Sequence, residues 1–197
     1  AQVTVETTGT MLLGSEIGAA LNALEPLNID LIGLNCATGP AEMSEHLRYL
    51  SKNAQCAISV MPNAGLPQLG PKGATYPLGP DALAQALATF VDDYKITLIG
   101  GCCGTTPEHM AAVVARLDRK QVMARTSHAD PGASSLYQYV PFRQDNAFLA
   151  IGERTNANGS RAFRDALISE NWETCVEIAR DQIRDGAQTV SYTHLRA

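Results

Sequence analysis

Three cysteines are the residues whose types and spacing most readily support chemistry in this chain. Cys102 and Cys103 are adjacent, and Cys36 follows an apolar run much earlier in the sequence. Thiolates are good zinc ligands, and a zinc ion with three protein ligands keeps a fourth position open, as in catalytic sites. The sequence therefore predicts that Cys36, Cys102 and Cys103 hold one zinc ion with an open position.

The surroundings of the cysteines favour this convergence. Adjacent residues on a regular strand point to opposite faces, so Cys102 and Cys103 reach one ion only if the backbone turns. Glycines that permit such a turn surround the pair, namely Gly100, Gly101 and Gly104. Residues 105–108 read as a helix start, and Cys36 likewise ends an apolar run and precedes a turn with proline. Both sites are therefore expected at the carboxyl ends of parallel strands, on one rim.

Burial in the core and disulfide formation are the alternatives to metal binding for these cysteines. A cysteine is often a small buried apolar residue, and this is the prediction for Cys56 and Cys175. A disulfide between Cys102 and Cys103 would be strained, and persistent disulfides are uncommon in a reducing compartment. The glycine-rich turn and the matching strand ends favour a metal for the other three.

Composition excludes several classes of function. The chain has 197 residues and a net charge of −5, without a basic patch interleaved with aromatic residues, so nucleic acid is not an expected partner. No apolar run approaches the roughly 18 residues that cross a membrane, and no signal peptide is visible. Five cysteines, two of them adjacent, do not suggest a secreted disulfide framework. We expect a cytoplasmic protein without a membrane partner.

Residues 1–120 alternate between strand and helix patterns. The expected strands are 2–6, 31–36, 56–61 and 95–101, and the expected helices are 15–27, 41–53, 80–94 and 107–117. A polar, proline- and glycine-rich stretch lies at 68–79. Four strand–helix units predict a parallel sheet covered by helices. Because an α/β barrel has eight units, the predicted fold is α/β, a partial (β/α)8 TIM barrel with two exposed strand edges.

The pattern changes after residue 120. Residues 121–147 have linker composition, and an apolar run at 148–152 begins a second α/β barrel. A polar loop follows, and then two helices over 161–170 and 172–185. The chain is thus expected to contain one partial barrel, a linker and the beginning of another barrel.

Several segments resemble the cobalamin-dependent methionine synthases. Residues 33–40, 61–67 and 100–109 are similar to the homocysteine-binding barrel of that family, and residues 151–156 with Gly159 and Ser160 resemble the start of its pterin-binding barrel. The Gly-Gly-Cys-Cys-Gly motif alone would admit other homocysteine methyltransferases. The fused Gly-Glu-Arg-Thr-Asn segment favours the cobalamin-dependent family, and the resemblance extends to about residue 188.

The resemblance implies a division of the chain into parts. Residues 1–120 correspond to the C-terminal half of a homocysteine-binding zinc barrel, 121–147 to the linker, and 148–188 to the start of a pterin-binding domain. Residues 189–197 resemble no expected continuation of the family, so we expect a non-native tail there, as from a frameshift junction.

The resemblance also implies an activity. In this family three cysteines, which match Cys36, Cys102 and Cys103, bind the zinc that activates homocysteine. The methyl group would pass from methyltetrahydrofolate through methylcobalamin, held by a cobalamin domain elsewhere in the intact enzyme, to the homocysteine thiolate, giving methionine. This chain alone is expected to be inactive. The alternatives are a corrinoid-independent, betaine-type homocysteine methyltransferase and a non-catalytic zinc-binding scaffold.

Further polar residues lie at expected strand ends. Asn63 is a candidate for binding the homocysteine amino or carboxylate group, and its alternative is a turn-forming role beside Gly65. Glu153 and Asn156 are candidates for binding the pterin ring, and their alternative is to stabilise their own loop. His46 and His109 are expected to be solvated and not to bind metal, as is usual for histidines in polar surroundings.

Overall fold

A four-stranded parallel sheet organises the first part of the protein. The computed structural model describes residues 1–71, 73–118, 120–121 and 123–194. The sheet order is β1-β2-β3-β6, and the strands are β1 (Gln2–Val3), β2 (Leu31–Asn35), β3 (Ala57–Met61) and β6 (Leu98–Ile99). Every neighbouring pair is parallel, as the register Ile32↔Ile58 illustrates. The predicted α/β class with a parallel sheet is confirmed, and in the described residues this sheet is open.

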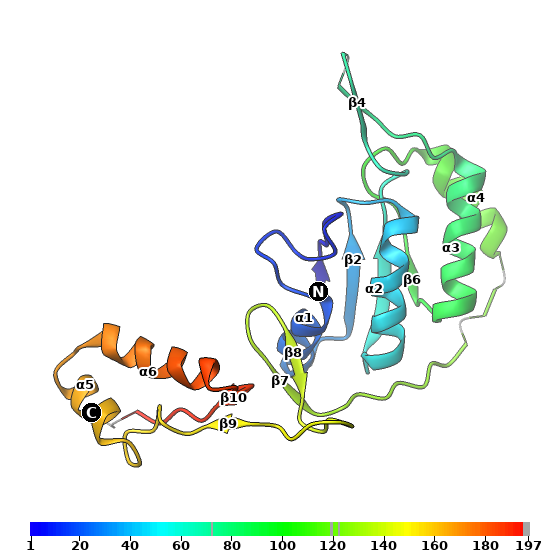
Figure 1. Ribbon diagram of the computed structural model, residues 1–197. Helices are drawn as coiled ribbons and strands as arrows, with labels where there is room; N and C mark the ends of the chain where they lie inside the picture. Colours follow the sequence, from blue (N-terminus) through cyan, green and yellow to red (C-terminus); the bar gives the residue numbers. More distant parts are fainter. Residues whose placement is uncertain (72, 119, 122, 195–197) are drawn as a thin grey trace. The chain divides into compact units, whose positions relative to one another are not determined.

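Helices cover this sheet and form the hydrophobic core with it. They are α1 (Ile17–Leu24), the short 3-10 helix η1 (Glu25–Leu27), α2 (Pro40–Asn53), α3 (Pro80–Tyr94) and α4 (Pro107–Leu117). Figure 1 shows α2, α3 and α4 beside one another along the sheet. Ile32 and Ile58 of the sheet are fully buried together with Leu47 of α2 and Leu87 of α3. Burial of this kind of apolar surface is the main source of stability in such a fold.

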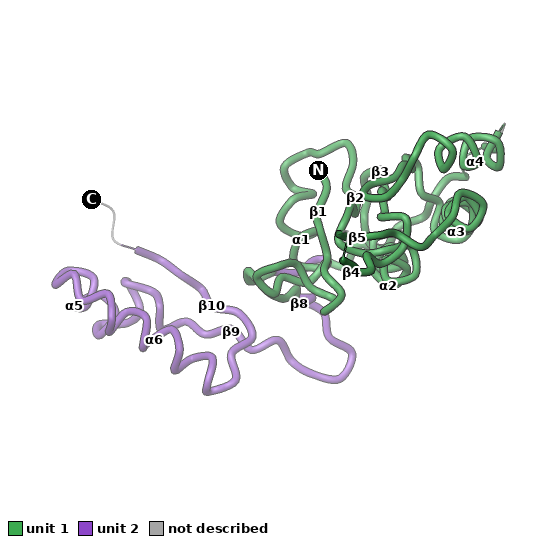
Figure 2. Tube along the Cα trace, turned by 90° about the horizontal axis from the view of Figure 1, so that it is seen from above, with its two compact units in different colours: residues 1–130, 134–139 green, residues 131–133, 140–197 purple. Residues whose placement is uncertain are grey.

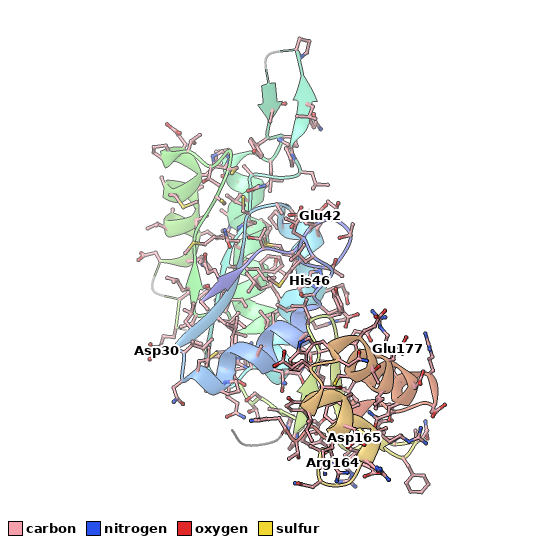
Figure 3. The ribbon with its side chains drawn as sticks, turned by 90° about the vertical axis from the view of Figure 1, so that its left-hand side faces the viewer. Asp30, Glu42, His46, Arg164, Asp165 and Glu177 are labelled. Atoms are coloured by element: carbon pink, nitrogen blue, oxygen red, sulfur yellow. The ribbon has the colours of Figure 1, made fainter. Side chains whose placement is uncertain are left out.

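Local sequence determines where the helices begin. Pro40, Pro80 and Pro107 each occupy the first helical turn, where the missing proline N–H costs nothing. The Glu42 carboxylate accepts a hydrogen bond of 3.1 Å from the Gly39 N–H and so caps α2. Figure 3 shows Glu42 near the end of the sheet from which a hairpin projects, and Asp30, just before β2, at the opposite end. The starts of α2 and α4 therefore mark the carboxyl-end rim of the sheet.

The projecting hairpin is an element that the sequence did not predict. Strands β4 (Gln68–Gly70) and β5 (Gly73–Thr75) pair antiparallel within the stretch that was interpreted as a polar loop. All described residues of the two strands are exposed, and Leu69 is 89% exposed. Figure 1 shows the hairpin extending beyond the end of the sheet. Without a buried face, such strands lack the alternation that reveals most strands in a sequence.

The chain separates into two compact units. Unit 1 comprises Ala1–Asp130 and Ser134–Tyr139, and unit 2 comprises Pro131–Ala133 and Val140–Ala197, coloured differently in Figure 2. The short strands β7 (Gly132–Ser134) and β8 (Tyr139–Pro141) form a two-stranded sheet. Part of the stretch interpreted as a linker therefore packs with unit 1. The predicted domain boundaries stay a prediction.

In its described residues, unit 2 has a parallel strand pair and two helices. Its elements are β9 (Ile151–Gly152), α5 (Arg161–Ile168), α6 (Trp172–Arg184) and β10 (Thr189–Val190). The side chain of Ser160 caps α5 and that of Asn171 caps α6. Thr189 pairs with Ile151, so the stretch expected to be a non-native tail supplies a strand next to β9. The origin of that stretch stays a prediction.

Two further sequence expectations concern burial and membranes. Cys56 and Cys175, both predicted to be small buried apolar residues, are each half-buried. In the described part of the chain, none of the helices combines the length and apolar character that a membrane crossing needs.

Candidate metal centre

The three predicted cysteine ligands meet at the carboxyl-end rim of the sheet. The Sγ atom of Cys103 lies 3.6 Å from that of Cys36 and 3.9 Å from that of Cys102. All three sulfur atoms lie within 4.8 Å of one another. Tetrahedral ligands at the usual zinc–sulfur distance of about 2.3 Å would be separated by about 3.8 Å. All five cysteines carry free thiols, and the spacing of these three suits one metal ion.

A tight turn brings the adjacent cysteines to the same side. The Thr105 N–H donates to the Cys102 carbonyl at 3.2 Å, and the Thr105 hydroxyl donates to the same oxygen at 2.6 Å. Gly104 lies within this turn at φ +80°, in the left-handed region that favours glycine. The predicted backbone turn between Cys102 and Cys103 is therefore present.

Cys36 reaches the cluster through an unusual backbone conformation. Cys36 and Ala37 have φ values of +60° and +57°, which residues with side chains rarely adopt. The Cys36 N–H donates to the Met61 carbonyl at 3.0 Å, and the Thr38 N–H donates to the Cys36 carbonyl at 2.6 Å. Strain of this kind costs about 1–3 kcal/mol per residue and is concentrated at functional sites. The surrounding hydrogen bonds thus hold Cys36 in the position from which its sulfur meets Cys103.

Asn63 ties the two cysteine loops together. Its Oδ1 atom accepts a hydrogen bond of 3.2 Å from the Cys103 N–H, and its own N–H donates to the Thr38 carbonyl at 3.0 Å. The Ala64 N–H also donates to the Cys103 carbonyl at 2.9 Å. Asn63 is only 3% exposed. Its observed contacts link the loops of the site, and its predicted contact with homocysteine stays a prediction.

Tyr76 is a residue at this site that the sequence interpretation missed. It follows β5 directly and is half-buried, and its ring lies against Gly104, since a Cβ atom added to Gly104 would lie 2.2 Å from the Tyr76 Cγ. A single aromatic residue in a polar stretch that follows a rim loop is the signal that could have indicated it. The residue shows that the segment after the hairpin lies against the cysteines.

The two adjacent thiols, Cys102 and Cys103, differ in their readiness to ionise. Burial raises the pKa of Cys102 to about 11, and hydrogen bonds to Cys36 and Cys103 act in the same direction. Hydrogen bonds from Cys36 and Cys102 lower the pKa of Cys103, and the exposed position of this thiol leaves it open to reagents. Helices α2 and α4 begin four residues after Cys36 and Cys103, and their positive ends favour anions at this rim. Cys103 is therefore more readily converted to a thiolate than Cys102.

His109 corrects one sequence expectation. It was expected to be solvated, but it is 7% exposed. Its Nδ1 accepts hydrogen bonds from the Thr106 N–H at 3.2 Å and the Thr106 hydroxyl at 2.9 Å, so Nε2 carries the proton and donates to the Leu78 carbonyl at 2.9 Å. The ring therefore caps α4 and holds the segment after Tyr76. His46, half-buried on α2, is not in the thiol cluster.

The residues predicted to bind a pterin lie in unit 2. Glu153 is exposed, and Asn156 is half-buried with its Oδ1 accepting from the Asn158 N–H at 2.9 Å. That hydrogen bond is the loop-stabilising contact considered as the alternative for Asn156. A cavity of about 300 Å³ is lined by Glu153 together with Arg154 and Gln182. Pterin binding by Glu153 and Asn156 stays a prediction.

A second cavity lies beside the thiol rim in unit 1. It measures about 450 Å³, and its described lining includes Gly39 and Glu42 of the α2 start, Gly65, and Phe90 of α3. These residues border the loops that carry Cys36 and Asn63. The thiols are not among its lining residues, so this cavity lies beside the metal centre and does not contain it.

Comparison with known proteins identifies the family of the chain. The sequence model of the family described as "Homocysteine S-methyltransferase" matches residues 1–117, the region that contains all three clustered cysteines. The chain belongs to the homocysteine S-methyltransferase family. The family membership inferred from the cysteine motifs is confirmed.

Curated relatives extend the match beyond residue 117. The chain is 63% identical over 187 residues to a protein named methionine synthase from Mycobacterium tuberculosis (strain ATCC 25618 / H37Rv), a match that covers 95% of the chain. It is also 63% identical over 190 residues to a methionine synthase from Mycobacterium leprae (strain TN), with 94% of the chain covered. The chain spans 16% of the length of each of these relatives.

Proposed function

We propose that this chain supplies the methyl-acceptor site of a zinc-dependent methionine synthase. The observation that carries the proposal is the cluster of Cys36, Cys102 and Cys103, whose sulfur–sulfur distances suit one zinc ion. Membership of the homocysteine S-methyltransferase family and the names of the relatives support it. In the proposed reaction a bond forms between the homocysteine sulfur and a methyl carbon while the bond from that carbon to its donor breaks, and methionine is the product.

Each residue of the site has a role in this proposal. Cys36, Cys102 and Cys103 would bind the ion, and Asn63 would hold the Cys103 loop in place. Bound zinc supplies a Lewis acid that keeps a thiol substrate deprotonated at neutral pH. Three thiolate ligands surround a divalent ion with more negative charge than it carries, so this ligand set favours an electron-rich substrate sulfur. Such a sulfur is the nucleophile that methyl transfer requires.

The donor side of the proposed reaction involves the rest of the intact enzyme. We propose methylcobalamin, held by a cobalamin domain, as the immediate donor and methyltetrahydrofolate as the ultimate donor. Residues 148–188, with Glu153 and Asn156, would form the start of the pterin-binding domain. The relatives match well beyond residue 117, which supports this fused arrangement over a betaine-type methyltransferase.

The fold is consistent with a barrel origin for this site. The parallel order β1-β2-β3-β6, with helices α2 and α4 starting at one rim, is that of consecutive units of a (β/α)8 barrel. We therefore propose that residues 1–120 are part of a homocysteine-binding barrel and that 121–147 connect it to the second domain. A reducing, cytoplasmic setting would keep the three thiols available for metal.

Zinc content of purified chain tests the metal site. We expect one zinc per chain in the wild type and none in the triple variant Cys36→Ser, Cys102→Ser, Cys103→Ser. The matched control is the double variant Cys56→Ser, Cys175→Ser, which removes two thiols outside the cluster and should retain zinc. A folded wild type without zinc, or a triple variant that retains it, would contradict the proposal.

The open ligand position needs a separate measurement. Zinc X-ray absorption should show one additional sulfur neighbour when homocysteine is added, and no additional sulfur when homoserine, its oxygen analogue, is added. An unchanged sulfur count with homocysteine would instead support the scaffold alternative, in which zinc is structural and its coordination is closed.

A further inference from the structure

His109 is buried in the first turn of α4 and is not part of the thiol cluster. We propose that His109 is a positioning residue of the metal centre, because its imidazole completes a closed circuit of hydrogen bonds that holds the turn carrying Cys102 and Cys103. The inference rests on the proposed function, since it presupposes a metal ion on the three thiols.

The hydrogen-bond circuit begins and ends at the cysteine turn. The Cys103 carbonyl accepts from the Ala64 N–H at 2.9 Å, and the Ala64 carbonyl accepts from the Leu78 N–H at 2.9 Å. The Leu78 carbonyl accepts from His109 Nε2 at 2.9 Å. The His109 Nδ1 accepts from the Thr106 N–H at 3.2 Å and from the Thr106 hydroxyl at 2.9 Å. Because Thr106 is three residues after Cys103, the chain itself closes the circuit.

The circuit joins three segments through one side chain. Ala64 lies in the loop after β3, Leu78 follows the hairpin, and His109 belongs to α4. The bonds from Cys103 to Ala64 and from Ala64 to Leu78 use backbone groups at both ends. The bond from Leu78 to α4 uses the imidazole, whose two nitrogens supply the acceptor that the N–H of Thr106 needs and the donor that the Leu78 carbonyl needs. A single substitution at His109 therefore opens the circuit.

The segment that His109 holds packs against the cysteine turn. Gly104 lies in this turn at φ +80°, and a Cβ atom added to it would lie 2.2 Å from the Cγ of Tyr76. Real Cβ atoms essentially never approach other heavy atoms so closely, so the Tyr76 ring covers the turn. Tyr76 is two residues before Leu78, so the bond that fixes Leu78 also fixes this ring. Without the bond from His109, the turn would lose one of its walls.

Metal affinity depends on how well the free thiols already match the bound arrangement. A thiol on a loosened turn has to be ordered when the ion binds, and this ordering costs free energy. Contacts outside the ligand set typically change metal affinity by about 10–100-fold. Because His109 acts through the backbone and not on a sulfur atom, we expect its loss to weaken zinc binding by about tenfold, at the lower end of that range.

Two substitutions at position 109 separate the two bonds of the imidazole. His109→Asn keeps an acceptor in the place of Nδ1 and has no atom in the place of Nε2, so it retains the cap of α4 and loses the bond to Leu78. His109→Gln puts an amide donor in the place of Nε2 and so retains that bond. The matched control is His128→Asn, which changes an exposed histidine outside the thiol cluster.

Zinc affinity and the cobalt(II) spectrum of the full chain are the two readouts. Chelator competition should show zinc binding about tenfold weaker in His109→Asn, with most of the affinity recovered in His109→Gln. With cobalt(II) in place of zinc, the ligand-field absorption bands should change in His109→Asn, because they depend on the coordination geometry. A residue that merely stabilised the fold would leave these bands unchanged, and His128→Asn should alter neither readout.

The outcomes separate this inference from the proposed function. Zinc binding by the wild type together with unchanged affinity and unchanged cobalt bands in His109→Asn would overturn the role of His109 alone. Absence of zinc from the folded wild type would overturn the proposed function and this role with it. If His109→Asn does not fold, His109→Glu is the second variant, because a carboxylate caps α4 but has no donor for Leu78. Its added negative charge by itself favours a cation, so weaker zinc binding there would report the lost bond.

Discussion

The side chain of Asn63 accepts a hydrogen bond of 3.2 Å from the backbone N–H of Cys103, across two loops that are forty residues apart in the sequence. Asn63 is nearly fully buried, whereas Cys103 is exposed, so this bond is partly shielded from water. The contact connects the rim loop after β3 to the turn after β6, and it places the backbone of Cys103 where its sulfur meets that of Cys36. Positioning of the thiols thus depends on polar groups outside the thiol cluster.

Replacing Asn63 tests this dependence. Asn63→Ala should lower the free energy of unfolding by about 1–3 kcal/mol, because the Cys103 N–H would lose its buried acceptor. Zinc affinity should fall as well, since the Cys103 loop would no longer be held. Urea unfolding and chelator competition measure the two effects.

Asn63→Asp is the matched control for this prediction. Asn63→Asp adds a negative charge near three thiols, but it keeps an oxygen acceptor for the Cys103 N–H. Because of this acceptor, it should retain more stability than Asn63→Ala at neutral pH. Equal stability of the wild type and Asn63→Ala would show that the hydrogen bond contributes nothing to the loop.

The thiols should differ in reactivity when no metal is bound. Cys103 is exposed and its pKa is lowered, so a larger fraction of it than of Cys102 is thiolate at neutral pH, and iodoacetamide should modify Cys103 before Cys102. Burial raises the pKa of Cys102 to about 11, so its alkylation rate should keep rising as the pH approaches that value. Peptide mapping by mass spectrometry at a series of pH values measures both rates.

Metal supplies the control for the reactivity prediction. Added zinc should protect Cys36, Cys102 and Cys103 and leave the rate at Cys175 unchanged. Faster alkylation of Cys102 than of Cys103 at neutral pH would contradict the assignment of the more acidic thiol.

The convergence of Cys36, Cys102 and Cys103 was predictable from the sequence, but the contacts that support their loops were not. Glycine, proline and capping residues act locally, so they revealed the turns that bring Cys36 and Cys103 to one rim. Tyr76 escaped detection because it follows an exposed hairpin that lacks hydrophobic alternation. The burial of His109 likewise follows from a tertiary contact, its bond to the Leu78 carbonyl. Backbone partners leave no pattern in the side chains of a sequence.

Two glycines with similar backbone angles allow the stability cost of backbone strain to be measured apart from the cost of steric overlap. Gly104 has φ +80° and faces Tyr76, whereas Gly9 has φ +85° and has no neighbouring atom within 4 Å of an added Cβ. Gly9→Ala should cost about 1–2 kcal/mol of stability from the left-handed backbone alone. Gly104→Ala should cost more, because the methyl group also displaces the Tyr76 ring.

Zinc affinity distinguishes the two glycine variants further. Gly104→Ala should weaken zinc binding, because displacement of the Tyr76 ring disturbs the turn that presents Cys103, and Gly9→Ala should not affect it. Thermal unfolding and chelator competition on both variants provide the comparison, and an equal effect of the two would refute the packing role assigned to Gly104.

Arg125 should fasten the stretch after α4 to unit 1. Its guanidinium donates to the carbonyl oxygens of Ser51 at 3.0 Å and Cys56 at 2.6 Å, and also to that of Ala54. These carbonyls lie at the C-terminal end of α2 and just beyond it, where a positive charge is favourable. Arg125→Ala should therefore lower the free energy of unfolding by about 1.5–3 kcal/mol. We expect a value toward the lower end, because the Arg125 side chain is only partly buried.

Amide hydrogen exchange tests whether Arg125 holds the adjoining backbone. The His128 N–H donates to the Lys52 carbonyl at 2.8 Å, so its amide should be protected in the wild type and exchange faster in Arg125→Ala. Arg125→Lys should restore only part of the protection, because a single ammonium group cannot reproduce the planar fork that reaches several carbonyls. Arg143→Ala, which removes an exposed arginine, is the matched control and should leave exchange at His128 unchanged. Unaltered exchange in Arg125→Ala would mean that the segment is held by its other contacts, such as the bond between the Asn22 amide and the Ser134 hydroxyl at 3.0 Å.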